Sequence, residues 1–404
     1  MTAKKTLILF DQVIVSGSNF IFSILIARHL GVDLLGQYAA FMIAVLFFSS
    51  IINAFFISPL LSTYHSIPSD KVNDYVHGFN TNCFIFIVLI SVISILYNLL
   101  FCYFESDYLM IFPLSYLLVE YIRKLALLKE DYLNMLIVSC IAYLGGFISL
   151  FLLLQYREAS IETLVSIQIV SFSLAIVYYA LVSKNYVLTR KWNNIKYSAK
   201  VSYDNGRWLF LTTFTQWFGE PFVLLLTSAL LGSFALGILR IVQNLIGLMN
   251  VIIQLLDNYT VIYFAKIYNY KKEKSSIYVL IKKLTSITIS IGVLFFLFMY
   301  LFGYEIVGFI YGSLDENKLN ITFLILSYVI IYIVQFLVLY ERAWLKVSQE
   351  TILILKATLV SMFITIILSY PIVSKFEVFG SVGLILLNWC VVYIYLILNR
   401  GRGE

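Results

Sequence analysis

Charged residues are scarce in this chain of 404 residues, since Asp, Glu, Lys and Arg together make up only 12% of it. Soluble globular domains carry about 25% charged residues, and disordered segments are poor in hydrophobic ones. Hydrophobic residues here reach 61%. The composition therefore excludes a soluble domain and a disordered tail. The net charge of +6 is divided among short segments, so it does not indicate nucleic-acid binding.

Motifs for catalysis and metal binding are missing as well. The three histidines, His29, His65 and His77, are isolated, and none of the four cysteines forms a Cys-x-x-Cys pair. The sequence contains no Walker A, Gly-x-Ser-x-Gly, HExxH or dinucleotide-binding motif. No connection between the apolar runs is long enough to hold a catalytic domain. We therefore expect no enzyme, no catalytic residues, no metal and no cofactor.

What the chain has in abundance is apolar runs of about 20 residues, the length that crosses a bilayer as a helix. These runs predict an all-α integral membrane protein with about 12 transmembrane helices. The predicted spans are residues 8–30, 38–62, 79–102, 108–126, 132–155, 161–182, 208–231, 235–258, 284–311, 319–340, 350–371 and 378–398.

The few basic residues indicate the orientation of the chain. Of 28 Lys and Arg residues, 22 fall in connections on the side of the N-terminus, including Arg123 and Arg342. The opposite side holds only Arg157, Lys318 and Lys375. Basic connections stay in the cytoplasm, so we predict a multi-pass protein with both termini cytoplasmic. The remaining three basic residues lie within predicted spans and are Arg28, Arg240 and Lys356.

A repeat of half the chain length is visible. Leu30-Gly31-x-x-x-Leu35-Gly36 recurs as Leu231-Gly232-x-x-x-Leu236-Gly237, each time after the first span of a half, where glycine permits a tight turn. We therefore expect two six-helix lobes related by a parallel internal repeat and facing a central cavity. The expected domains are an N-terminal lobe (residues 1–182), a basic cytoplasmic linker (183–207) and a C-terminal lobe (208–404).

Polar side chains form stripes within the apolar spans. In the eighth span they recur every three or four residues and so share one helix face. The first and seventh spans hold further examples. Such groups are costly in hydrocarbon, so they either line a cavity or form hydrogen bonds between packed helices. The candidates for cavity lining are Asn19, Gln216, Gln243, Asn244, Asn250 and Gln254.

Single charges within the spans have alternative interpretations. Glu220, which precedes Pro221 in the seventh span, is either a titrating carboxylate or part of a structural kink. Arg28 and Arg240 either extend toward the membrane surface or contact an anion. Glu120 is explained by an ion pair with Arg123, three residues later in its helix. Asp11, at the cytoplasmic end of the first span, is expected to be hydrated.

Four segments resemble bacterial polysaccharide flippases of the multidrug/oligosaccharidyl-lipid/polysaccharide exporter superfamily. They are DQVIVSGSNF at 11–20, ARHLG at 27–31 with the following LGxY, GRWL at 206–209 with Gln216-Trp217, and LLGxxALGxLRxxQNL at 230–245. The resemblance extends over both halves of the chain. It implies a twelve-helix fold of two six-helix lobes.

The resemblance also implies a function. Such a flippase moves undecaprenyl-pyrophosphate-linked oligosaccharide repeat units across the bacterial cytoplasmic (inner) membrane by alternating access, for surface polysaccharides such as O-antigen. Arg28 and Arg240 are then candidates for the pyrophosphate, and Glu220 for coupling to H⁺ or Na⁺. Its partners are the lipid-linked oligosaccharide and the bilayer, with a polysaccharide polymerase and a chain-length regulator as further candidates and no nucleic acid. The alternatives are a drug/cation antiporter of the same superfamily, or a membrane polysaccharide polymerase or sugar acyltransferase.

Overall fold

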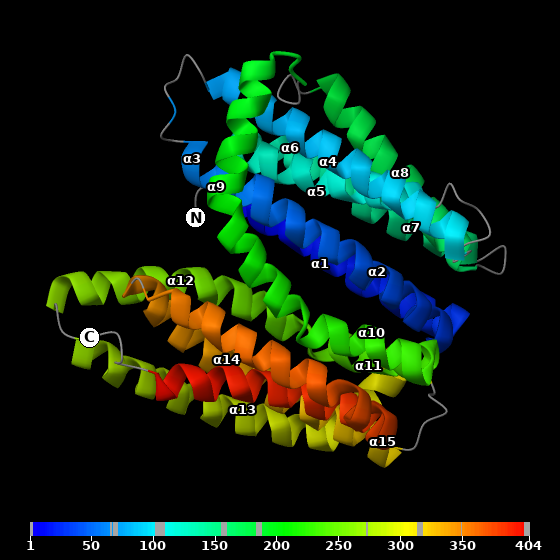
Figure 1. The fold of residues 1–404 in the computed structure, drawn as a ribbon. Coiled ribbons are helices and arrows are strands. Elements are labelled where there is room, and N and C mark those ends of the chain that lie inside the picture. The colour runs from blue at the N-terminus through cyan, green and yellow to red at the C-terminus, as the bar shows by residue number, and fades with distance from the viewer. Residues whose placement is uncertain are drawn as a thin grey trace. The chain divides into compact units, whose positions relative to one another are not determined.

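The computed structural model describes residues 3–64, 67, 72–101, 110–154, 160–182, 188–271, 274–312, 318–348 and 350–399 (Figure 1). Within these ranges every regular element is a helix, and no strand is present. Eight helices are long and apolar enough to cross a membrane, and a bent helix pair makes a ninth candidate. The predicted all-α membrane fold is therefore confirmed.

The chain divides into two compact units. Unit 1 comprises residues 1–34 and 41–213, and unit 2 comprises residues 35–40 and 214–404. The helical segments assigned mainly to unit 1 are α1 (Ala3–Leu30), α2 (Val32–Ile52), η1 (Asn53–Ile57), α3 (Ser58–Thr63), α4 (Val72–Phe101), α5 (Phe112–Leu128), α6 (Tyr132–Ser139), η4 (Cys140–Leu144), α7 (Gly145–Leu154), α8 (Ile161–Val182) and α9 (Trp192–Trp217). Those of unit 2 are α10 (Glu220–Leu231), α11 (Ser233–Ile246), α12 (Leu248–Lys271), α13 (Lys274–Tyr311), α14 (Lys318–Val347) and α15 (Ile352–Leu398).

Each predicted span coincides with one helix or with consecutive helical segments. The fifth span is divided into α6, η4 and α7 by a π-helical turn, and the second contains another such turn. Helix α15 covers the last two predicted spans, which meet at Glu377, a residue with non-helical backbone angles (φ 52°, ψ −133°). The predicted boundary between the last two spans therefore corresponds to a kink at Glu377, although α15 is continuous by its backbone hydrogen bonds.

Aromatic and aliphatic side chains hold each unit together. In unit 1, α5 packs against α4 and α8, and α1 packs against α6 and η4. Phe79, Phe112 and Tyr179 are fully buried there. In unit 2, α14 packs against α12, α13 and α15 (Figure 1).

The repeated glycines adopt the same backbone conformation in both halves. Gly31 precedes α2 with φ 95° and ψ 163°, and Gly232 precedes α11 with φ 89° and ψ 170°. Both values of φ lie in the region that only glycine occupies without strain. The expected glycine turn between the first two spans of each half is therefore confirmed.

Replacing Gly232 by Val is expected to destabilise the protein by about 1–3 kcal/mol, because a β-branched residue is strained at positive φ. Space is not the cause, since a Cβ atom on Gly232 has no neighbour within 4 Å. Gly383→Val is the matched control, because Gly383 is helical and equally open. The midpoint of thermal unfolding in detergent should fall for Gly232→Val alone, and equal midpoints would contradict the strain argument.

Candidate functional site

A break between α9 and α10 sets the geometry of the candidate site in unit 2. The two helices are bent by 42° where α9 ends at Trp217 and α10 begins at Glu220. Pro221 lies in the first turn of α10, where its missing N–H is not needed, and Gly219 is the N-cap. The kink expected from Glu220-Pro221 is therefore present. It places the Glu220 carboxylate at a helix N-terminus, where the helix dipole favours negative charge.

Glu220 belongs to a hydrogen-bonded chain of three side chains. The Gln243 amide donates from Nε2 to Glu220 Oε1. Arg240 donates from Nη1 to Gln243 Oε1 at 3.4 Å. Arg240 and Gln243 are three residues apart on α11 and so share one face of that helix. The structure thus brings together three of the residues selected from the sequence.

Glu220 also lines a polar cavity of about 220 Å³ within unit 2. We call this the polar cavity. Its wall is formed by residues from α9, α10, α14 and α15, namely Thr215, Gln216, Glu220, Pro221, Arg342, Thr358, Ser361, Asn388, Trp389 and Val392. One carboxylate and one guanidinium therefore face the same space inside a bundle of apolar helices.

Hydrogen bonds between helices hold the wall of the polar cavity in place. Thr215 on α9 bonds Thr358 on α15 at 3.1 Å between their hydroxyl oxygens. Asn388 Nδ2 donates to Thr365 Oγ1 at 3.0 Å, and Ser361 Oγ donates to the Asn388 carbonyl at 3.0 Å. The first bond joins α9 to α15, and the other two join the parts of α15 before and after Glu377. The cavity is a built feature of the fold, with its polar groups fixed in direction.

The sequence predicts that the tenth span ends at residue 340 and that Arg342 lies in the following connection, and this is wrong, because Arg342 is helical. Helix α14 continues to Val347, because the segment after residue 340 contains no helix breaker and buries Ala343, Trp344 and Leu345. Arg342 therefore lies on a helix, with its guanidinium carbon 5.5 Å from the centre of the Trp389 ring. A guanidinium over an aromatic face gains a cation–π interaction.

The other predicted site residues lie elsewhere. Arg28 and Asn19 are exposed on α1 in unit 1, and Asn244 is half-buried on α11. The side chains of Asn250 and Gln254 lie outside the described part of the structure. Sequence reasoning missed Asn388, although an amide within an apolar span is the kind of signal used for the others.

A second group of charges is buried in unit 1. Arg123 on α5 donates to Asp11 on α1 and to Glu120 on α5, each at 2.6 Å. Tyr143 donates to the same Glu120 oxygen at 2.5 Å, and Ser139 donates to Asp11. Both donors belong to or border the π-helical turn η4. We call these five residues the charged cluster.

The charged cluster confirms one expectation and corrects two. The predicted ion pair between Glu120 and Arg123 is present. Asp11, however, is only 5% exposed and not hydrated, because Arg123 and Ser139 replace water around its carboxylate. Arg123 is 7% exposed and pairs within the bundle, so it does not belong among the loop residues that set the orientation. Among the described residues, no group of three or more His, Cys, Asp and Glu could hold a metal ion.

Comparison of the fold shows similarity to membrane transporters over almost the whole chain. The inward-closed structure of the lipid II flippase MurJ superposes with a TM-score of 0.74 and 11% identity, covering 97% of this chain and 87% of that one. An inward-facing multidrug resistance MATE family transporter of the MOP superfamily gives 0.67 and 13%, covering 99% and 98%. A MOP superfamily transporter from Pyrococcus furiosus gives 0.66 and 12%, covering 99% and 95%.

Sequence comparison adds nothing to this result, since no protein-family model and no curated protein matches the chain. The superpositions show that the chain has the fold of these multi-pass membrane proteins. At identities of 11–13% they show nothing beyond the fold. The substrate has to be argued from the residues of the site.

Proposed function

We propose that this chain is a flippase that carries undecaprenyl-pyrophosphate-linked oligosaccharide repeat units across the bacterial inner membrane by alternating access, with both termini in the cytoplasm. The observation that supports it most directly is the polar cavity at the α9–α10 break, where Glu220, Arg342 and Asn388 are exposed to one space. Polar groups within membrane spans are costly and mark substrate or ion pathways. A sugar head group linked to a pyrophosphate needs amides, hydroxyls and a guanidinium, all of which unit 2 supplies.

The residues have distinct proposed roles. The proposed pyrophosphate ligands are Arg240 in unit 2 and Arg28 in unit 1, because a guanidinium forms paired hydrogen bonds with phosphate oxygens. For hydrogen bonds with the sugar hydroxyls we propose Gln216, which lines the polar cavity. We propose the same role for Asn19, Gln243 and Asn244, which do not belong to the wall of that cavity, and for Asn250 and Gln254, whose side chains lie outside the described part of the structure. The surface polysaccharide made from such units, O-antigen or another polymer, is a further part of the proposal, as are contacts with a polymerase and a chain-length regulator.

The hydrogen-bonded chain from Glu220 to Arg240 suggests how an ion gradient is coupled to substrate. While Glu220 is ionised, it accepts from the Gln243 amide, whose oxygen accepts from Arg240. We propose Glu220 as the coupling carboxylate, because the Gln243 amide connects it to the Arg240 guanidinium, so a change in its charge acts on the proposed pyrophosphate ligand.

One observation favours the rival function, a drug/cation antiporter. The charged cluster in unit 1 holds two carboxylates and one guanidinium, so it carries an excess negative charge that suits a cation. We rank this second, because the cluster is closed by its own hydrogen bonds, whereas the groups of the polar cavity face open space.

Removal of the protein from its host tests the proposed function. We expect a lipid-linked oligosaccharide to accumulate on the cytoplasmic leaflet, measured by leaflet-specific labelling of its sugar and mass spectrometry of extracted lipids. Restoring the chain from a plasmid should clear it. Absence of any such lipid, together with new sensitivity to toxic organic cations, would overturn the flippase and support the antiporter.

A further inference from the structure

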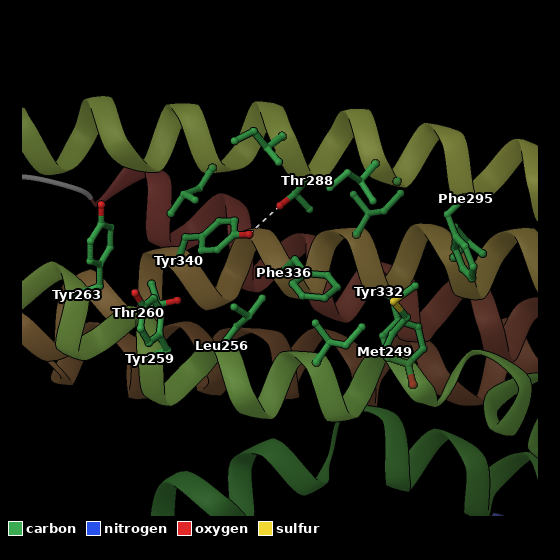
Figure 2. A pocket seen from close by; sticks show the side chains of 17 residues that line it. Met249, Leu256, Tyr259, Thr260, Tyr263, Thr288, Phe295, Tyr332, Phe336 and Tyr340 are labelled. Carbon is green, nitrogen blue, oxygen red and sulfur yellow. Dashed lines mark hydrogen bonds between the residues drawn. The ribbon is translucent and has the colours of Figure 1, made fainter. Parts of the chain in front are cut away.

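Unit 2 contains a second cavity, separate from the polar cavity. It measures about 440 Å³. Side chains of α12, α13 and α14 line it, as Figure 2 shows. We call it the apolar crevice. Its wall consists of Met249, Ile252, Leu256, Tyr259, Thr260, Tyr263, Leu284, Ile287, Thr288, Ile291, Gly292, Phe295, Val329, Tyr332, Ile333, Phe336 and Tyr340. The volume falls in the range of about 300–1,000 Å³ that is usual for ligand pockets.

The apolar crevice is elongated along the helices. Its lining residues recur every three or four positions on each of the three helices, so successive turns contribute to one continuous wall. At about 1.5 Å per residue, the wall extends for about 21 Å along α12 and about 16 Å along α13 and α14. This is more than half of the roughly 30 Å thickness of the hydrocarbon layer of a bilayer. The shape suits a chain that lies parallel to the helices.

Hardly any polar group is available inside the crevice. The hydroxyl groups of Thr288 and Tyr340 lie 2.7 Å apart and form a hydrogen bond with each other, which Figure 2 shows. The crevice is also accessible from outside, since Ile252 and Ile291 are 44% and 60% exposed. A ligand here enters from the surrounding apolar phase and has no charged or strongly polar part. Hydrocarbon is the chemistry that fits.

Aromatic rings favour one class of hydrocarbon. Tyr259, Phe295, Tyr332 and Phe336 all contribute to the wall (Figure 2). The double bonds of a polyisoprenoid are planar, so each can lie flat against an aromatic ring, which the saturated part of an acyl chain cannot do. Gly292 accommodates the end of the Ile333 side chain, to which a Cβ atom at this position would approach to 2.6 Å, so a larger residue here would displace the Ile333 side chain of the wall.

We propose that the apolar crevice binds the polyisoprenoid chain of the transported lipid, an inference that rests on the proposed flippase function. The chain remains in an apolar environment while the head group crosses, so its hydration never contributes to the barrier.

Photolabelling tests this assignment. The full chain is reconstituted in nanodiscs with a polyprenyl phosphate that carries a diazirine in its isoprenoid chain, and labelled peptides are identified by mass spectrometry. We expect labels on α12, α13 and α14 that are competed by undecaprenyl phosphate and not by a dioleoyl phospholipid. Gly292→Leu should lower this labelling by about tenfold. Gly308→Leu is the matched control, because Gly308 lies on the same helix and faces open space.

A second variant guards against misfolding of the first. Ile252→Trp fills the crevice from its exposed side and should lower labelling as well. Equal competition by the phospholipid, or unchanged labelling in both variants, overturns the assignment. If the labels are confined to other helices while lipid-linked sugar is still flipped, the crevice does not bind the isoprenoid chain, and the proposed flippase function is unaffected. If the unaltered chain shows neither labelling nor flipping, the proposed function is wrong, and so is the assignment of the crevice that rests on it.

Discussion

Replacing Arg240 by Ala is expected to lower transport of the lipid-linked oligosaccharide by about tenfold to a hundredfold, since a hydrogen bond to a charged group contributes about 1.5–3 kcal/mol. Arg240 is half-buried on α11, and its guanidinium donates to the neutral oxygen of Gln243. Its charge is therefore available for an anionic substrate. The measurement is the rate at which labelled lipid-linked sugar reaches the outer leaflet, normalised to the amount of protein in the membrane.

Two further variants separate charge from geometry. Arg240→Lys retains the charge and loses the planar guanidinium, so it should retain only part of the activity. Arg190→Ala removes an exposed arginine outside the helices and should leave transport unchanged. Normal transport by Arg240→Ala would remove this residue from the mechanism. Equal loss in Arg240→Ala and Arg190→Ala would show that net charge, and not position, decides.

Local features of this fold could be predicted from the sequence. Apolar runs predict the helices because a membrane span must satisfy its backbone hydrogen bonds internally, as a helix does. The side chains of such a helix are then apolar where they face lipid. The turns at Gly31 and Gly232 could also be predicted, since a positive φ restricts the choice of residue at that position alone. The break before Glu220 follows from proline chemistry within a few residues.

Contacts distant in sequence could not be predicted. Asp11 and Arg123 are 112 positions apart, and nothing in either neighbourhood indicates that one neutralises the other. A hydropathy scale ranks each residue by its free energy of transfer from water and takes no account of a partner side chain. It therefore predicts that the tenth span ends before Arg342. In the structure α14 continues, because Arg342 has a cation–π contact with Trp389 and the residues that follow are buried.

The apolar crevice could not be predicted from the sequence for a different reason. Its residues, such as Leu256 and Phe336, are the same types that face lipid or pack between helices. Whether three helices close on one another or leave a space depends on side-chain volumes summed over all of them. Gly292, for example, packs against the end of the Ile333 side chain, and neither sequence segment indicates this contact between α13 and α14.

Replacing Arg123 by Met is expected to destabilise the protein by about 3–5 kcal/mol, the usual cost of leaving a buried charge without its partner. Asp11 and Glu120 both depend on this guanidinium, and Arg123 is itself 7% exposed. Methionine has a similar length and no charge, so packing changes little. We expect a much shorter half-life of the purified protein at fixed temperature in detergent, the appropriate measure where unfolding is irreversible. Arg207→Met, on the exposed face of α9, is the control.

The cause of the loss can be established by removing the carboxylates as well. Adding Asp11→Asn and Glu120→Gln to Arg123→Met leaves a neutral cluster in which Tyr143 and Ser139 still have acceptors. Replacing all members of a buried ionic group is often neutral or stabilising, whereas removing one is not. The triple variant should therefore regain most of the lost half-life. A triple variant as unstable as Arg123→Met would show that the guanidinium acts through its packing, including its contact with the Tyr143 ring, and not through its charge.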